Sequence, residues 1–169
     1  MPRMLSLNAR RAMTAERTGE VPVVLVTIEH PELPEPIRLS SDPSERLSTD
    51  PLIYGTRSRG EEYLFVAMSA PLPSETEGAP PNAQIVCDNV DRRVVETVRS
   101  VVSPPPTMTL EICLASDPDT VEEAYEDMVA LVADYDVGQV TINLGVESFV
   151  SEPYPSVTFN PTRFPGLFR

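Results

Sequence analysis

The stretch TMTLEICL, residues 107–114, alternates polar and apolar side chains along its whole length. Successive side chains of a β-strand point to opposite faces, so this pattern predicts a strand with one face in the core and the other in solvent. Upstream, VPVVLVTI at residues 21–28 is rich in β-branched side chains and predicts a second strand that is buried along much of its length. Strands of this kind favour a mainly β fold.

The segments around these strands predict two hairpins. The turn at residues 30–36 is broken by prolines, and Ile37-Arg38-Leu39 can pair back on residues 21–28. Residues 52–54 and 63–68 flank a turn at residues 55–60 and predict a second hairpin, reached through a polar segment at residues 40–50. Two further strands are predicted, at residues 83–88 and 140–144.

Two short helices are predicted. Leu5, Ala9, Ala12 and Met13 recur at helical spacing, so residues 6–17 predict an amphipathic helix with Ser6 as its cap. The valines of residues 91–102 also recur at helical spacing, and three prolines at residues 104–106 forbid continuation of that helix. The predicted fold class is therefore mainly β with one or two short helices, an α+β arrangement.

Residues 120–137 give two conflicting signals. The spacing of Val121, Ala124, Tyr125, Met128 and other apolar residues fits a helix. The turn-like residues 134–139, however, precede a strand that would need an antiparallel partner just upstream. We therefore predict a strand at residues 128–132.

The chain length of 169 residues favours one compact domain. We expect an N-terminal helix or arm at residues 1–20, a β-rich domain at residues 21–151 and an extended C-terminal arm at residues 152–169. Within the domain, residues 71–81 are proline-rich and acidic, and predict an exposed loop.

The charge is strongly negative, with a formal net charge of -13 and a sequence pI near 4.4. Such a surface repels phosphate groups, so we expect no specific binding of DNA. All 13 basic residues are arginines. No apolar run is long enough for a secretory signal or a membrane span, so we expect a protein made and kept in a cytoplasm without membrane insertion.

Catalytic patterns are poorly represented. The single histidine, His30, precedes a proline in a turn and is predicted to lie on the surface. Asp134-x-Asp136-x-Gly138 resembles the start of a calcium loop, but Gly145 stands where the bidentate glutamate would be needed. Cys87 and Cys113 lie in predicted strands and are interpreted as core thiols, with a disulfide or a metal site as alternatives. We expect no enzymatic activity, no cofactor and no resident metal.

Two segments carry a resemblance to a known family: AQIVCDNVD at residues 83–91 and TMTLEICLASDPD at residues 107–119. Together with Ala9-Arg10-Arg11-Ala12, residues 23–31 and the ending 159–168, they resemble the phage tail-component family called domain of unknown function 1833. The chain is more distantly similar to the N-terminal half of the minor tail protein L of lambdoid phages. Residues 1–169 contain no counterpart of the cysteine-rich metal-cluster region of that protein, so we expect no iron–sulfur role.

The resemblance implies a small β-barrel or β-sandwich of the tail-hub or distal-tail type. It also implies a structural subunit of a bacteriophage or phage-like tail tip, located in the virion tail and assembled in the host cytoplasm. A homohexameric ring, or alternatively a trimer, would surround the DNA channel. It would contact the tail tube protein, the tape-measure protein and hub or baseplate proteins. A receptor- or carbohydrate-binding β module is the alternative function, and a small tail-associated hydrolase is less favoured.

Seven residues are candidate assembly contacts. Arg57 and Arg59, at a hairpin tip, would either pair with the carboxylates of a neighbouring subunit or remain solvated. The apolar side chains of the C-terminal arm would either fill pockets on a neighbour or cover the chain's own core: these are Tyr154, Phe159, Phe164, Leu167 and Phe168.

Overall fold

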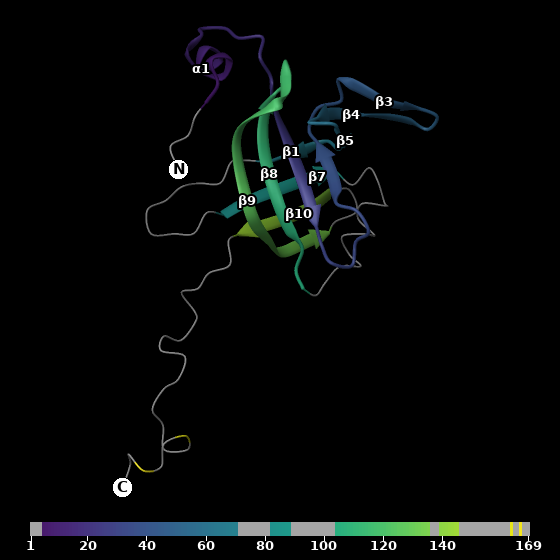
Figure 1. Cartoon of the computed structure of the whole chain (residues 1–169), viewed down its shortest axis with the longest axis vertical. Helices are drawn as coiled ribbons and strands as arrows, with labels where there is room; N and C mark the ends of the chain where they lie inside the picture. Colours follow the sequence, from purple (N-terminus) through teal and green to yellow (C-terminus); the bar gives the residue numbers. More distant parts are fainter. Residues whose placement is uncertain are drawn as a thin grey trace.

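The computed structural model describes residues 5–70, 82–88, 104–135 and 139–145, together with Arg163 and Gly166. These residues form one helix and a ten-stranded sheet (Figure 1), which confirms the mainly β class. The elements are α1 (Leu7–Thr14), β1 (Pro22–Glu29), β2 (Ile37–Ser40), β3 (Glu45–Thr49), β4 (Leu52–Ser58), β5 (Glu61–Phe65), β6 (Met68–Ser69), β7 (Asn82–Asp88), β8 (Thr107–Leu114), β9 (Asp117–Tyr135) and β10 (Gln139–Gly145).

Some predictions fall outside the described residues. They are the helix at residues 91–102, the loop at residues 71–81, and nearly all of the C-terminal arm at residues 152–169. Within the described part of the chain, no helix has the length and apolar character needed to cross a membrane.

The strands predicted at residues 21–28 and 107–114, on which the fold prediction rests, pair with each other as β1 and β8. β1 and β8 run antiparallel over eight residue pairs, from Pro22 opposite Leu114 to Glu29 opposite Thr107. β2 lies on the other side of β1 and pairs with it antiparallel, as the predicted hairpin requires. The order of the whole sheet is β3-β4-β5-β2-β1-β8-β9-β10-β7-β6, and β2 and β5 are parallel.

The longest strand, β9, resolves the ambiguous segment as a strand as far as Tyr135. It pairs with β8 on one side and with β10 on the other, and its register shifts three times against β8 and once against β10. Three of these shifts each leave one extra residue in β9, and the shift between Val121 and Asp117 leaves three. Extra residues of this kind bend a strand. Asp127, with φ of 55°, lies at one of these irregularities. Extra residues break the alternation of a regular strand, and this is why the apolar residues of β9 have nearly helical spacing.

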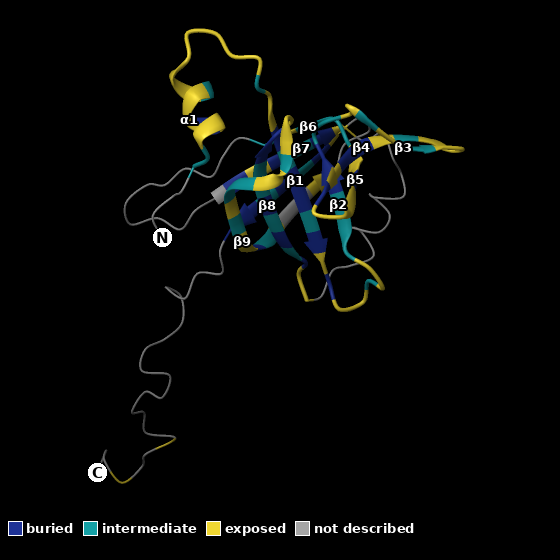
Figure 2. Cartoon of the chain, turned by 45° about the horizontal axis from the view of Figure 1, so that its top comes forward, coloured by how far each residue is buried: buried dark blue, intermediate teal, exposed yellow. Residues whose placement is uncertain are grey.

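The bend in β9 folds the sheet over on itself. In Figure 1, β7 and β10 cross β1 and β8, and buried residues of the two parts meet between them. The β1–β2–β8 part contributes Val26, Ile28, Leu39, Met108 and Leu110 to this core. The other part contributes residues of β7, β9 and β10: Ala83, Ile85, Cys87, Met128, Val140, Ile142 and Leu144. Figure 2 shows buried, dark blue residues along β1 and β8, whereas α1 and the outer end of the β3–β4 hairpin are largely yellow or teal.

The sheet is not closed into a barrel, so the barrel form of the prediction is wrong. Its two outer strands, β3 and β6, do not pair with each other. Only two residues, Val66 and Ala67, separate β5 from β6. On one side, Val66 N–H donates to the Ser40 carbonyl, and on the other, Asp88 N–H donates to the Ala67 carbonyl. This short segment therefore connects the two parts covalently, in place of a closing strand ladder.

β3, β4 and β5 form a second, smaller layer that projects from the body (Figures 1 and 2). β4 and β5 are the second predicted hairpin, and their two-residue turn has φ of 52° at Arg59 and 86° at Gly60. Two positive φ values are typical of a type I′ turn, which matches the twist of antiparallel strands. β3 was not predicted, because all its residues are exposed or only partly buried and leave no alternating apolar pattern.

Gly55 of β4 marks the tightest approach in this layer. A Cβ added at Gly55 would lie 1.9 Å from the Tyr63 carbonyl oxygen and 2.8 Å from Cδ1 of Leu47. We expect Gly55→Ala to lower the free energy of unfolding by about 1–3 kcal/mol, because backbone atoms of β5 must move. Denaturant titration followed by circular dichroism would measure it.

Gly19→Ala is the matched control, since a Cβ there would meet no heavy atom within 4 Å. Equal stability of the two variants would show that the close contact between β4 and β5 does not constrain the fold.

Candidate interaction surfaces

The tip of the β4–β5 hairpin is fastened to the tip of the β8–β9 hairpin. The buried Ser58 hydroxyl donates to the Pro118 carbonyl at 2.7 Å, and the backbone N–H of Arg59 donates to the Asp119 carboxylate. A second polar contact joins β4 to β2, where the buried hydroxyls of Thr56 and Ser40 are 2.7 Å apart. Buried hydroxyls are costly without partners, so these bonds define how the small layer sits on the body.

Arg59 adds an ion pair to this contact. Its guanidinium donates to both carboxylate oxygens of Glu111 on β8, and also to the Tyr63 hydroxyl at 3.4 Å. Hydrogen bonding to Glu111 raises the pKa of Arg59 further above the ordinary arginine value. The Glu111 side chain is only 14% exposed, so solvent screens this pair less than a fully exposed one.

Arg57 lies on the opposite face of the hairpin and bridges two strands. Its guanidinium is 2.7 Å from Glu45 on β3 and 2.9 Å from Glu62 on β5. The hydrogen bond that Arg57 donates to Glu62, together with the charge of Glu45, raises the pKa of Arg57. All three side chains are about half exposed, so this network contributes little to stability.

His30 is buried, so its predicted surface position is wrong. Its Nδ1 accepts the backbone N–H of Glu32 at 3.0 Å, and its Nε2 lies 2.9 Å from the Pro104 carbonyl oxygen. Because a carbonyl can only accept, Nε2 carries the proton and Nδ1 is free to accept. The ring ties the β1–β2 turn to the segment that enters β8, a role in the fold that its position before a proline did not indicate.

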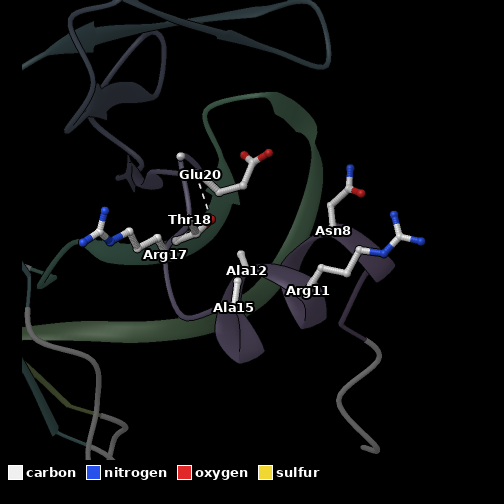
Figure 3. Close-up of a pocket in the computed structure, with 8 residues that line it drawn as sticks. Asn8, Arg11, Ala12, Ala15, Arg17, Thr18 and Glu20 are labelled. Atoms are coloured by element: carbon white, nitrogen blue, oxygen red, sulfur yellow. Dashed lines mark hydrogen bonds between the residues drawn. The ribbon is translucent and has the colours of Figure 1, made fainter.

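A shallow depression of about 290 Å³ lies between α1 and the segment that leads from it to β1. It is lined by Asn8, Arg11, Ala12, Ala15, Arg17, Thr18, Gly19 and Glu20. In Figure 3, the guanidinium groups of Arg11 and Arg17 point to opposite sides, so they do not converge on one anion. The depression therefore lacks the geometry of a phosphate or carboxylate site.

The family comparison places the chain among proteins defined by sequence rather than by a known activity. The model of a family described as Domain of unknown function (DUF1833) matches residues 8–159. The chain belongs to this family. No curated protein matches it.

In this DUF1833 protein, Arg57 and Arg59 already have carboxylate partners within their own chain. Their contact with a neighbouring subunit stays a prediction, as do the contacts of the five C-terminal candidates, which lie outside the described residues.

Cys87 and Cys113 are free and buried, which confirms the core interpretation. Asp134, the first acidic residue of the pattern that resembles a calcium loop, is exposed on β9. In residues 5–70, 82–88, 104–135 and 139–145, no three histidine, cysteine or acidic side chains gather as metal ligands would.

The exposed arginines of α1, Arg10 and Arg11, form a surface that was not predicted. The signal was available, because four of the 13 arginines fall within the first 17 residues of an otherwise acidic chain.

The pair of Arg59 and Glu111 can be measured by a double-mutant cycle. Arg59→Asn keeps a residue that tolerates positive φ, and Glu111→Gln keeps the shape of the partner. We expect a coupling energy of about 1 kcal/mol in equilibrium unfolding, after allowance for partial exposure.

The matched cycle of Arg57→Asn with Glu62→Gln should show a smaller coupling, because that pair is more exposed. A coupling near zero for Arg59 and Glu111 would contradict the view that this pair fastens the hairpin.

The two thiols should make stability depend on pH in the alkaline range. Burial raises the pKa of Cys87 and Cys113 from 9.0 to about 11. The unfolded chain therefore loses these protons first, so stability is fully present below pH 9 and declines as the pH rises toward 11. The decline should be about 2–3 kcal/mol per thiol.

Comparison with a Cys87→Ala, Cys113→Ala variant isolates the contribution of the thiols from that of tyrosines and arginines. If both proteins have the same pH dependence of unfolding, the thiols are not held neutral by the core.

Proposed function

We propose that this DUF1833 protein is a structural subunit of a bacteriophage or phage-like tail tip. In this proposal it forms a ring at the distal end of the tail tube, around the DNA channel, and joins the tube to the hub or baseplate. Family membership and the resemblance of the sequence to phage tail components support this function. The structural observation that carries it is the projecting β3–β4–β5 layer.

This layer exposes large apolar side chains on one of its faces. Leu52 and Tyr54 on β4 are 61% and 44% exposed, and Phe65 on β5 is 37% exposed. Alternation along the strands places them on the same face as the buried Thr56 and Tyr63. Nearer the body this face is covered by β1 and β8, whereas its outer end is uncovered. An apolar face of this kind favours a protein partner.

The distribution of charge fits a conduit for DNA. A ring subunit that lines a channel must let DNA pass without binding it. Phosphate groups are repelled by a chain with a net charge of -13, and this repulsion disfavours retention of the DNA. The proposed partners are therefore proteins: further copies of the chain, tail tube protein, tape-measure protein and hub or baseplate proteins. We propose a ring of six, with three as the alternative.

The proposal is tested by the place and the mass of the protein. Electron microscopy of intact particles with a labelled subunit should show the label at the distal end of the tail tube. Light scattering on the purified protein should give the mass of a ring rather than that of one 18.6 kDa chain. A protein that is absent from particles and remains a single chain, or that binds a glycan in this state, would contradict the proposal.

The apolar face can be tested separately. We expect Leu52→Ser with Tyr54→Ser to weaken incorporation into particles without loss of folding, because both side chains are exposed in the single chain. Val21→Ser is the matched control, since Val21 is 57% exposed and lies outside this layer. Incorporation equal to that of the unmodified protein would exclude this face as a contact.

Removal of residues 163–169 tests the C-terminal candidates. If Phe164, Leu167 and Phe168 fill pockets on a neighbour, the truncated protein should fold but assemble less well. Unchanged assembly would contradict that role.

A further inference from the structure

The charge of this chain is divided unequally along its length. Residues 1–20 contain four arginines and two glutamates, a formal charge of +2, which leaves -15 for the remaining chain. A short cationic segment on a strongly acidic protein is attracted to acidic surfaces, including those of other copies of the same chain.

Helix α1 presents this cationic charge outward. Leu7, Arg10, Arg11 and Thr14 are separated by three or four residues, so they share one face of the helix. All four are exposed, and Leu7 is 70% exposed. In the part of the chain that the structure describes, neither Arg10 nor Arg11 forms an ion pair. Arg38, Arg57 and Arg59, by contrast, each pair with a glutamate.

The opposite side of α1 holds it to its own chain. The backbone N–H of Ser6 donates to Glu122 on β9 at 2.7 Å, and the Ser6 hydroxyl donates to the same carboxylate. Ala9 is the only buried residue of the helix. This attachment leaves the outer face of α1 uncovered, as the exposed ribbon of α1 shows in Figure 2.

Strand β9 offers the complementary surface. Its 19 residues include seven carboxylates and no arginine. Beyond Glu122, its exposed residues include Glu126, Asp127 and Asp134, and also Leu131, which is 58% exposed. The outer face of α1 combines arginines with an exposed leucine, and this part of β9 combines carboxylates with an exposed leucine. The two surfaces match in both charge and apolar character.

We infer that the outer face of α1 in one copy docks on the exposed side of β9 in a second copy. The contact joins two different surfaces, so it is head-to-tail, and a series of such contacts closes into a ring when the rotation between copies allows it. This inference rests on the proposed function, because it names the contact between neighbouring subunits of the ring.

A charge-swap experiment on the full chain tests the contact. The helix variant carries Arg10→Glu and Arg11→Glu and has a formal net charge of -17, whereas the strand variant carries Glu126→Arg and Asp134→Arg and has -9. Each variant alone brings like charges together at the contact. Its self-association should therefore be weaker than that of the unmodified protein by about tenfold or more. Mixing them should restore association, because every contact between unlike variants joins opposite charges. A ring of six can close with the two variants alternating, whereas a ring of three would retain one like-charge contact.

The strand variant also separates a specific contact from general repulsion. A reduced net charge lessens repulsion between copies, so a purely general effect would strengthen its association rather than weaken it. Arg17→Glu is the matched control for Arg11→Glu, because Arg17 is an exposed arginine that lies beyond the end of α1 and points to the opposite side (Figure 3). Circular dichroism would verify that each variant is folded, and light scattering would measure its mass.

The outcomes separate this inference from the proposed function. Loss of assembly in both variants and its recovery on mixing would establish the contact. Assembly of either variant at the concentration that suffices for the unmodified protein would overturn the contact but leave the ring intact. Failure of the two variants to associate with each other would also overturn it. An unmodified protein that remains a single chain would overturn both.

Discussion

The structure depends on the bend in β9. This strand pairs with β8 at one end and with β10 at the other, so it belongs to both parts of the folded sheet. Four register shifts bend it enough to bring β7 and β10 over β1 and β8, and the main core forms in the space between them. A straight strand of the same length would leave these apolar faces in water, and burial of such faces is the main favourable contribution to folding.

The second layer is positioned by polar contacts rather than by a large core. Among the described residues, the buried apolar cluster between this layer and the body is small, and it consists of Val23, Leu25, Tyr63 and Cys113. Around them, buried hydroxyls and the pair of Arg59 with Glu111 fix the hairpin on the β8–β9 tip. Hydrogen bonds depend on geometry, so they determine orientation more sharply than apolar contact does. This leaves the outer end of β4 free to project, with its apolar face uncovered.

The exposed features of the molecule are of two kinds, and they suit two different contacts. The outer end of the β3–β4–β5 layer is apolar, whereas α1 is cationic and β9 is acidic. In the proposed ring, charge complementarity orients neighbouring copies, while burial of the apolar face supplies affinity for a partner protein. An acidic body remains between these contacts and repels DNA.

The sequence by itself determined the local structure wherever a pattern depends on neighbouring residues alone. Alternation predicted β8, β-branched content predicted β1, and Ser6 was predicted as the cap of α1. The tertiary structure alone decided the features that depend on distant partners. The bulges of β9 exist because β8 and β10 must both be paired. Burial of His30 requires the Pro104 carbonyl, and the partner of Arg59 lies 52 residues away. Spacing along a chain records which side chains share a face, but not which surface that face will meet.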